Sequence, residues 1–175
     1  MCQPRGLRNC NPLNIRRVAG TEWRGQCAEQ TDKGFVQFEF IEWGIRAAFC
    51  LLRTYRDKYN AICIRDIISR WAPPSENDTE RYIRNVCLWT GFGGFQRLTE
   101  KDWPRLVRAM ARQECGTLLD EETINKGYKL YKNIKDEKQK HLGSAAEGTG
   151  RCHHRSPHST RNDRLHGQRP VLNEA

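Results

Sequence analysis

The sequence predicts an α+β domain that is mainly helical, with a small β region at its N-terminal end. Between residues 42 and 134, apolar side chains recur at the i, i+3, i+4 and i+7 spacing of amphipathic helices. Before residue 41, Asn, Gly and Pro cluster around short segments of alternating apolar and polar residues, which is typical of turns and strands. With 175 residues, 37% of them hydrophobic, the chain can form one domain with a core.

Two short strands are expected in the N-terminal region. Turn-forming residues precede the first strand, which is expected over 14–18; they are Asn9, Asn11, Pro12 and Asn14. The second, over 35–40, is F-V-Q-F-E-F, in which Val36, Phe38 and Phe40 share one face of a half-buried strand. The asparagines are also residues that simply cap turns.

Helices are expected from Glu42 to about residue 135. The first carries the apolar stripe Ile45, Ala48, Phe49, Leu52 and Tyr55, and the second, over 64–71, is ended by two prolines at 73 and 74. The residues expected to begin the next three helices are Asn77 or Asp78, Thr99 or Asp102, and Asp120. The last helix carries Ile124, Tyr128 and Tyr131 on its apolar side.

The segment 103–116, W-P-R-L-V-R-A-M-A-R-Q-E-C-G, predicts a core helix that ends on an acid. Glu114 continues the helix's apolar stripe one turn before a stop at Gly116; the stripe is Trp103, Leu106, Val107, Met110 and Ala111. Burial raises the pKa of a carboxyl group, and a carboxyl that stays protonated near neutrality can donate a proton to a leaving group. The other interpretation is that Glu114 reaches solvent or pairs with one of the many arginines.

The composition changes near residue 136. All five histidines lie in residues 136–175, among Gly, Ser, Thr and Arg and with few large apolar residues. We therefore expect a globular domain over 5–135 and a disordered, basic tail over 136–175. In the tail, Cys152, His153 and His154 would form only a weak metal site, and neither a metal nor a cofactor is expected. Most of the net charge of +9 belongs to the domain.

The eight cysteines indicate free thiols in a reduced, cytosolic protein, because they are scattered without a C-x-x-C pair and several fall within predicted helices. We expect no membrane span, since no run of about 18 apolar residues is present. Met1 to Cys10 also lacks the apolar stretch of a signal peptide.

Several classes of chemistry are excluded by the lack of histidine before residue 141. A Ser-His-Asp or Cys-His site would need a histidine from the tail, and no H-E-x-x-H motif or P-loop is present. The basic charge suits a polyanion, but no motif for specific nucleic-acid binding is visible. Carboxylates remain as general acids, and glycosidic bond cleavage needs one protonated acid with either a second carboxylate or help from the substrate.

An ordered series of motifs over about residues 5–130 resembles a phage-derived family. The motifs are R-G-L-R-N-C-N-P-L-N-I-R-R, W-R-G, F-V-Q-F, W-G-I-R-A, I-I-S-R-W-A-P-P-S-E-N-D-T-E-R-Y-I and A-M-A-R-Q-E-C-G. They look like those of phage and prophage virion structural proteins that carry a lysozyme-like, peptidoglycan-degrading domain, here of a Bacteroides type. The resemblance implies a lysozyme-like fold, action on peptidoglycan glycan strands and contact with other virion proteins.

The helix ending in Q-E-C-G also resembles the helix ending in E-S-G that carries the catalytic acid of lytic transglycosylases and goose-type lysozymes. In those enzymes the helix precedes the β region, so a circular permutation of the lysozyme-like fold would reconcile the two orders. This resemblance implies that Glu114 is the general acid on the MurNAc–GlcNAc bond and that Asn11 and Asn14 line the sugar cleft. Asp32 is the candidate second carboxylate, ahead of Glu22 and Glu39, although a loop Asp is often a turn former.

The motif between the second and third helices supplies further substrate-binding candidates, which are Trp71, Glu76, Asn77 and Tyr82. Glu76 is also consistent with loop or capping chemistry.

The chain departs from the family pattern at three positions. Relatives tend to have N-N-P-G-N where this chain has Cys10 and Leu13, and Cys115 replaces the small polar residue of E-S-G. The alternative is therefore a non-catalytic virion structural or cell-wall-binding protein that keeps the fold and holds anionic wall polymer on its basic surface. Either protein would be made in the bacterial cytoplasm and act at the cell wall, in the periplasm or in a virion.

Overall fold

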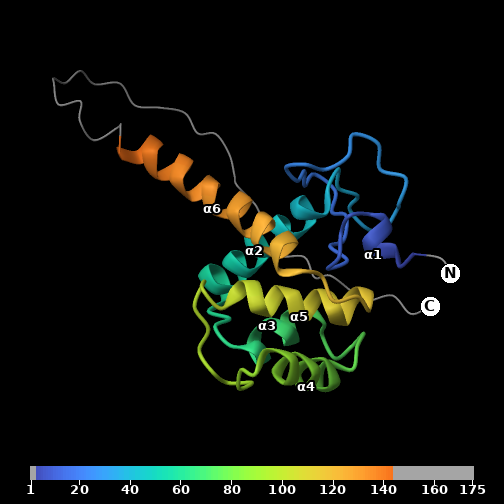
Figure 1. Cartoon of the computed structure of the whole chain (residues 1–175), viewed down its shortest axis with the longest axis vertical. Coiled ribbons are helices and arrows are strands. Elements are labelled where there is room, and N and C mark those ends of the chain that lie inside the picture. The colour runs from blue at the N-terminus through green and yellow to red at the C-terminus, as the bar shows by residue number, and fades with distance from the viewer. Residues whose placement is uncertain (1–2, 144–175) are drawn as a thin grey trace.

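The computed structural model describes residues 3–143, and over 134–143 it describes the helical backbone alone. Its helices, in chain order, are α1 (Arg5–Arg8), α2 (Ile41–Tyr59), α3 (Ile64–Trp71), α4 (Thr79–Thr90), α5 (Trp103–Cys115) and α6 (Glu121–Gly143) (Figure 1). The prediction of a mainly helical fold is confirmed. Within the described residues, no helix combines the length and the apolar character needed to cross a membrane.

The helices form two groups that meet at α5. Helix α2 packs along α6, while α3 packs on α4 and α4 packs on α5 (Figure 1). The N-terminal segment, residues 3–40, lies beside α2, and its short helix α1 contacts α5. The end of α5 that carries Glu114 therefore lies between the helical group and the N-terminal segment.

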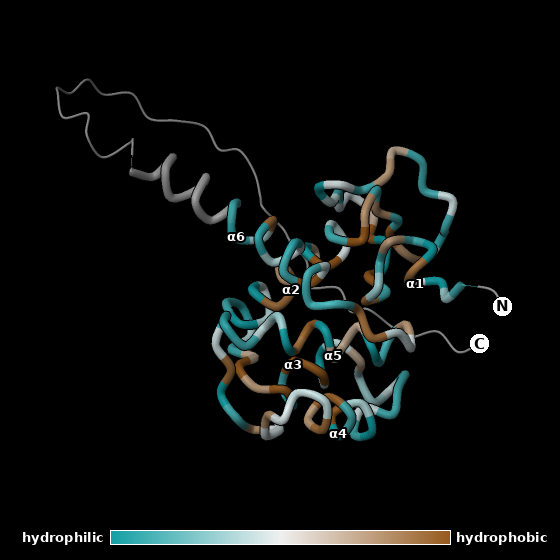
Figure 2. Tube along the Cα trace, viewed as in Figure 1, coloured by the Kyte–Doolittle hydropathy of each residue, from teal (hydrophilic) through white to brown (hydrophobic). Residues whose placement is uncertain are grey.

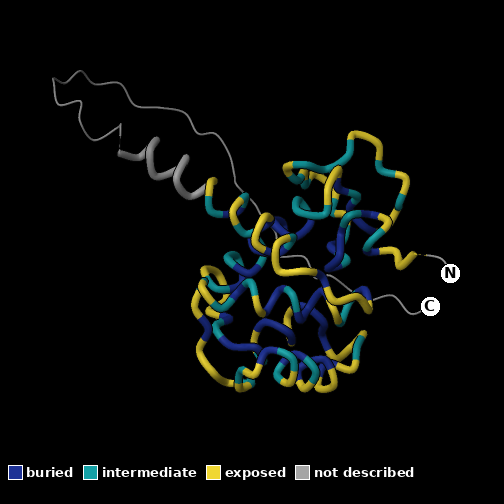
Figure 3. The backbone as a smooth tube through the Cα atoms, viewed as in Figure 1, coloured by how far each residue is buried: buried dark blue, intermediate teal, exposed yellow. Residues whose placement is uncertain are grey.

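The core is built from the apolar faces that the sequence predicts. On α5, Trp103, Leu106, Val107, Met110 and Ala111 are all at most 2% exposed. The apolar stripe of α2 is buried in the same cluster, as are Ile124 and Tyr131 of α6. Apolar and buried segments accordingly coincide in the interior, where the helices face one another (Figures 2 and 3).

The helix ends follow the predicted signals. Asp78 accepts a hydrogen bond from the backbone N–H of Arg81 and caps α4, and Asp120 accepts one from Thr123 and caps α6. Helix α3 ends at Trp71, just before the two prolines. Gly116 adopts a left-handed φ of 68° and ends α5 directly after Cys115.

The two predicted strands over 14–18 and 35–40 are wrong, because the described N-terminal segment contains only two isolated bridges, Arg16 to Phe35 and Gln26 to Phe38. Only a few backbone bonds join the two segments, such as that from the N–H of Val36 to the carbonyl of Ile15. Side-chain amides bond further backbone groups: Asn11 donates to the carbonyls of Ile15 and Val36 and accepts from the N–H of Ile15.

Phe40 is also not on the buried face that was expected. It is 63% exposed, whereas Val36 and Phe38 are buried. The backbone at Phe40 is extended as the N-cap residue of α2, so the alternation stops where the helix begins.

The predicted domain boundary lies inside α6, which continues from the domain through residue 135 to Gly143. Most of the predicted tail, residues 144–175 with Cys152, His153 and His154, lies outside the described residues.

Candidate functional site

Glu114 lies in the last turn of α5, and its carboxylate is held by three neutral hydrogen-bond donors from three other segments. The indole Nε1–H of Trp71 and the hydroxyl of Tyr82 each donate to Oε1 at 3.0 Å. The side-chain amide of Asn14 donates to Oε2 at 3.1 Å and to the backbone carbonyl of Glu114 at 3.3 Å. Both carboxylate oxygens are thus positioned by fixed donors.

The α3–α4 connection brings Trp71 and Tyr82 to the same oxygen. Trp71 is the last residue of α3 and is fully buried, with its ring edge-on to that of Tyr55 at 6.2 Å. Tyr82 lies in the first turn of α4 and is also buried. The hydroxyl of Thr79 donates to the carbonyl of Ala72 at 2.6 Å and ties the two helix ends together.

Asn14 reaches Glu114 from the N-terminal segment because its backbone is left-handed. Its φ is 48°, a conformation that asparagine tolerates better than most residues. Gly6 of α1 packs against it closely: a Cβ on Gly6 would lie 3.1 Å from Oδ1 of Asn14 and 3.4 Å from Cβ of Cys115. The absence of a side chain at position 6 therefore lets α1, Asn14 and the end of α5 approach one another.

The environment of Glu114 raises the pKa of its carboxyl to about 7. Burial is the largest cause, since it penalises the charged form, and the three hydrogen bonds lower the pKa only in part. Taken as a whole residue, Glu114 is intermediate between buried and exposed. Its carboxyl group is therefore an acid that exchanges its proton near neutral pH.

The hydroxyl of Tyr82 stays protonated at neutral pH. Its own burial, followed by the nearby charge of Glu114, raises its pKa well above the ordinary value. Tyr82 therefore acts as a hydrogen-bond donor to Glu114 at neutral pH and is not a base.

Glu114 has no ion pair with an arginine or lysine within the described residues. The interpretation that it serves as a surface partner for one of the arginines does not fit this arrangement. Cations would lower its pKa, whereas three neutral donors leave it raised.

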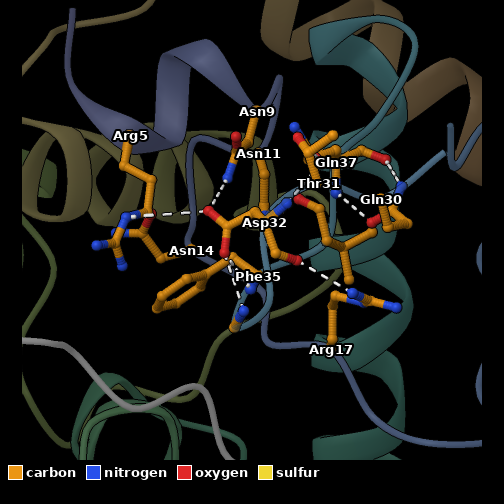
Figure 4. A network of polar contacts seen from close by, with 12 residues as sticks. Arg5, Asn9, Asn11, Asn14, Arg17, Gln30, Thr31, Asp32, Phe35 and Gln37 are labelled. Carbon is orange, nitrogen blue, oxygen red and sulfur yellow. Dashed lines mark hydrogen bonds and ion pairs between the residues drawn. The ribbon is translucent and has the colours of Figure 1, made fainter.

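Asp32, the candidate second carboxylate, is occupied by its own loop (Figure 4). Oδ1 accepts from the backbone N–H groups of Gly34 and Phe35, and Oδ2 accepts from the side-chain amide of Asn9 at 2.7 Å. Burial raises the pKa of Asp32, but these bonds and the charge of Arg5 at 4.0 Å outweigh it, so the pKa lies below its ordinary value. No carboxylate is among the groups that shift the pKa of Glu114.

The remaining candidates fall into different environments. Asn11 is fully buried and its amide is used by backbone groups, so it does not line a cleft, contrary to the prediction. Glu76 is exposed in the α3–α4 loop, and the half-buried Asn77 donates to the carbonyl of Pro73 at 3.4 Å. Glu22 and Glu39 are both exposed.

The sequence interpretation missed Asn9 and Gly6. Asn9 fixes Asp32, and Gly6 provides the space in which Asn14 meets Glu114. The turn-rich run R-G-L-R-N-C-N-P indicated a tight structure here, but it carried no signal for the distant partners of either residue.

By its fold and site, the protein is a mainly helical protein with one carboxyl group of raised pKa. That group, on Glu114, lies where the helices meet the N-terminal segment. No family model matches the chain. The chain is 44% identical over 115 residues to Protein P5 of Pseudoalteromonas phage PM2, an alignment that covers 65% of this chain and 72% of that protein. The chain belongs to the family of this Protein P5, and the similarity supports its phage origin.

Proposed function

We propose that the protein cleaves the MurNAc–GlcNAc bond of peptidoglycan, with Glu114 as the general acid. The observation that carries this proposal is the pKa of about 7 of the Glu114 carboxyl group, which three neutral donors hold in place. General acids work best when their pKa lies near the working pH, because the protonated form is then present and still gives up its proton readily. The domain proposed over 5–135 contains Glu114 and all of its partners.

In the proposed reaction, the carboxyl proton of Glu114 passes to the glycosidic oxygen as the bond to C1 breaks. Trp71, Tyr82 and Asn14 position the carboxyl and compensate the charge it acquires once the proton has left. We assign these residues to positioning, because each already contacts Glu114. The loop with Glu76 and Asn77 joins the helices of Trp71 and Tyr82, and it would contact the glycan strand.

The site favours a reaction without a second protein carboxylate. Asp32 is held by four groups of its own surroundings, and it does not influence the pKa of Glu114. In the lytic transglycosylase reaction, the 6-hydroxyl of the muramic acid attacks C1, and the Glu114 carboxylate takes up the hydroxyl proton. The product then carries an anhydro end, whereas hydrolysis would give a reducing end.

The second candidate is a non-catalytic virion or cell-wall-binding protein. The loop role of Asp32 is consistent with it, since one carboxyl group of raised pKa does not by itself make an enzyme. In both cases we propose that the protein is made in the bacterial cytoplasm and meets peptidoglycan at the cell wall or from within a virion.

Mass spectrometry of soluble muropeptides tests the proposal. The full-length wild type, Glu114→Gln and the control Glu29→Gln, which removes an exposed carboxylate, would each be incubated with Gram-negative sacculi. We expect anhydro fragments from the wild type and the control, and a loss of about 10²–10⁴-fold in Glu114→Gln. Reducing ends would indicate hydrolysis. Absence of fragments from a folded wild type would leave the non-catalytic candidate.

A further inference from the structure

A cavity lies on the side of α5 away from Glu114, where residues from the end of α4 and the start of α6 line it together with α5. Its volume is about 490 Å³, within the range of small-molecule sites. The residues that define its character are Trp89, Lys101, Arg105, Arg108, Arg112 and Leu118. It is separate from the surroundings of Glu114, with which it shares no lining residue.

Three arginines of α5 point to this cavity because of their spacing. Counted from Arg105, Arg108 lies three residues further along the chain and Arg112 lies seven. The three side chains therefore share one helix face and span roughly 10 Å along it. Glu114 follows Arg112 by two residues and therefore lies on a different face. The same helix thus presents an acid to one site and a row of cations to another.

Only one of these arginines is neutralised. Arg108 donates to the carbonyl of Leu119 at 2.7 Å and pairs with Glu121 at 3.1 Å. Within the described residues, Lys101, Arg105 and Arg112 have no ion pair. The carboxylate that lines the cavity is already engaged, so the cavity keeps a positive charge.

The two unpaired guanidinium groups are nevertheless held in place. Arg112 lies over the ring of Trp89 at 4.2 Å, and Arg105 lies over the ring of Phe92 at 5.3 Å. Such stacking uses the faces of the guanidinium and leaves its N–H edges available. These edges form the planar fork that matches the oxygens of a phosphate group.

We propose that this cavity binds the phosphate groups of a phosphate-bearing ligand. Arg105 and Arg112 contact the phosphate oxygens, Lys101 adds a third positive charge, and Trp89 and Leu118 contact the less polar part of the ligand. The ligand is either a free phosphate compound or the phosphodiester of a polymer, which offer the same oxygens to the same cations.

Titration of the full-length protein with inorganic pyrophosphate, and separately with a short oligothymidylate, tests this inference. Binding is followed by calorimetry and by the indole N–H resonance of Trp89, identified with Trp89→Phe. The test variant is Arg105→Gln/Arg112→Gln, which leaves the bonds of Arg108 intact. The control is Arg84→Gln/Arg97→Gln, which removes the same charge from exposed positions outside the cavity.

We expect the test variant to weaken pyrophosphate binding at least tenfold and to abolish the shift of the Trp89 resonance, while the control binds as the wild type does. Displacement of pyrophosphate by the oligothymidylate would identify a polymer phosphodiester as the source; failure to displace it would identify a small phosphate compound. Equal weakening in both variants, or no pyrophosphate binding by a folded wild type, would overturn the proposal.

Discussion

Tyr82 and Glu114 are 32 residues apart in the chain, yet the phenol hydroxyl donates to the carboxylate at 3.0 Å within a buried environment. The bond lowers the pKa of Glu114 and raises that of Tyr82. The proton affinity of the acid is therefore adjusted by a residue on another helix.

Tyr82→Phe is expected to raise the pKa of Glu114 above about 7, because it removes a donor that stabilises the charged form. A general acid must be protonated, so the alkaline limb of the kcat/KM profile should move to higher pH. NMR titration of ¹³C-labelled glutamate measures the same pKa without relying on activity. Tyr59→Phe, at an exposed position, should leave the pKa unchanged.

Glu114→Gln is expected to stabilise the protein at alkaline pH. The folded-state pKa is raised from 4.5 to about 7, so the folded protein binds the proton more tightly than the unfolded chain does. The free energy of unfolding of the wild type therefore falls as pH rises from 4.5 to 7 and is constant above, by about 3 kcal/mol in total. Glutamine lacks this dependence.

Urea unfolding at a series of pH values measures this effect. The difference in free energy of unfolding between Glu114→Gln and the wild type should grow from pH 4.5 to 7 and then level off. A difference that is independent of pH would contradict the raised pKa.

Asn14→Ala is expected to be less stable than Asn14→Gly, although both lose the bond to Glu114. The φ of 48° suits glycine, whereas alanine in this region costs about 1–2 kcal/mol. Both variants should lose activity to a similar extent, because the amide is missing in each. Thermal unfolding ranks the two, and the reverse order would argue against a left-handed residue 14.

Gly44→Ala is expected to destabilise the domain by about 1–3 kcal/mol through overpacking. The added Cβ would lie 2.3 Å from the carbonyl oxygen of Cys10 and 3.1 Å from Cα of Asn11. Gly93→Ala is the matched control, since its Cβ would meet only Gln96 at 3.6 Å. Denaturant midpoints of the two variants should therefore differ clearly.

Removal of residues 144–175 is expected to leave the thermal midpoint unchanged. Residues 144–175 contain few large apolar side chains that could add to a core. Differential scanning calorimetry of the full chain and of residues 1–143 makes the comparison, and a large drop in the shortened chain would mean that the removed residues contribute to the core.

The helices could be predicted from the sequence because their signals are local. The stripe from Trp103 to Ala111 places Glu114 on the buried side of α5, and Gly116 marks its end. The contacts of Glu114 could not be predicted in this way, since Asn14, Trp71 and Tyr82 belong to other segments. The motifs that resemble the phage family selected these residues and Glu114 separately, but they did not indicate that the three residues bond to Glu114.

The N-terminal segment was harder to predict because side chains bond several of the backbone groups that a strand ladder would pair. The alternation in F-V-Q-F-E-F indicated a strand, whereas Gln30 bonds both the N–H and the carbonyl of Gln37. A pattern of apolar residues does not reveal such a replacement, since it reports which side chains are buried and not what satisfies the backbone.

The bond from Asn14 to Glu114 closes a loop of 100 residues, against 43 for Trp71 and 32 for Tyr82. Contacts of long sequence separation require the largest loss of chain entropy and tend to form late in folding. The helices can thus place Trp71 and Tyr82 on Glu114 before the N-terminal segment docks. Docking then adds the third donor, whose bond lowers the pKa of Glu114, so this late step of folding completes the hydrogen bonding of the carboxyl group.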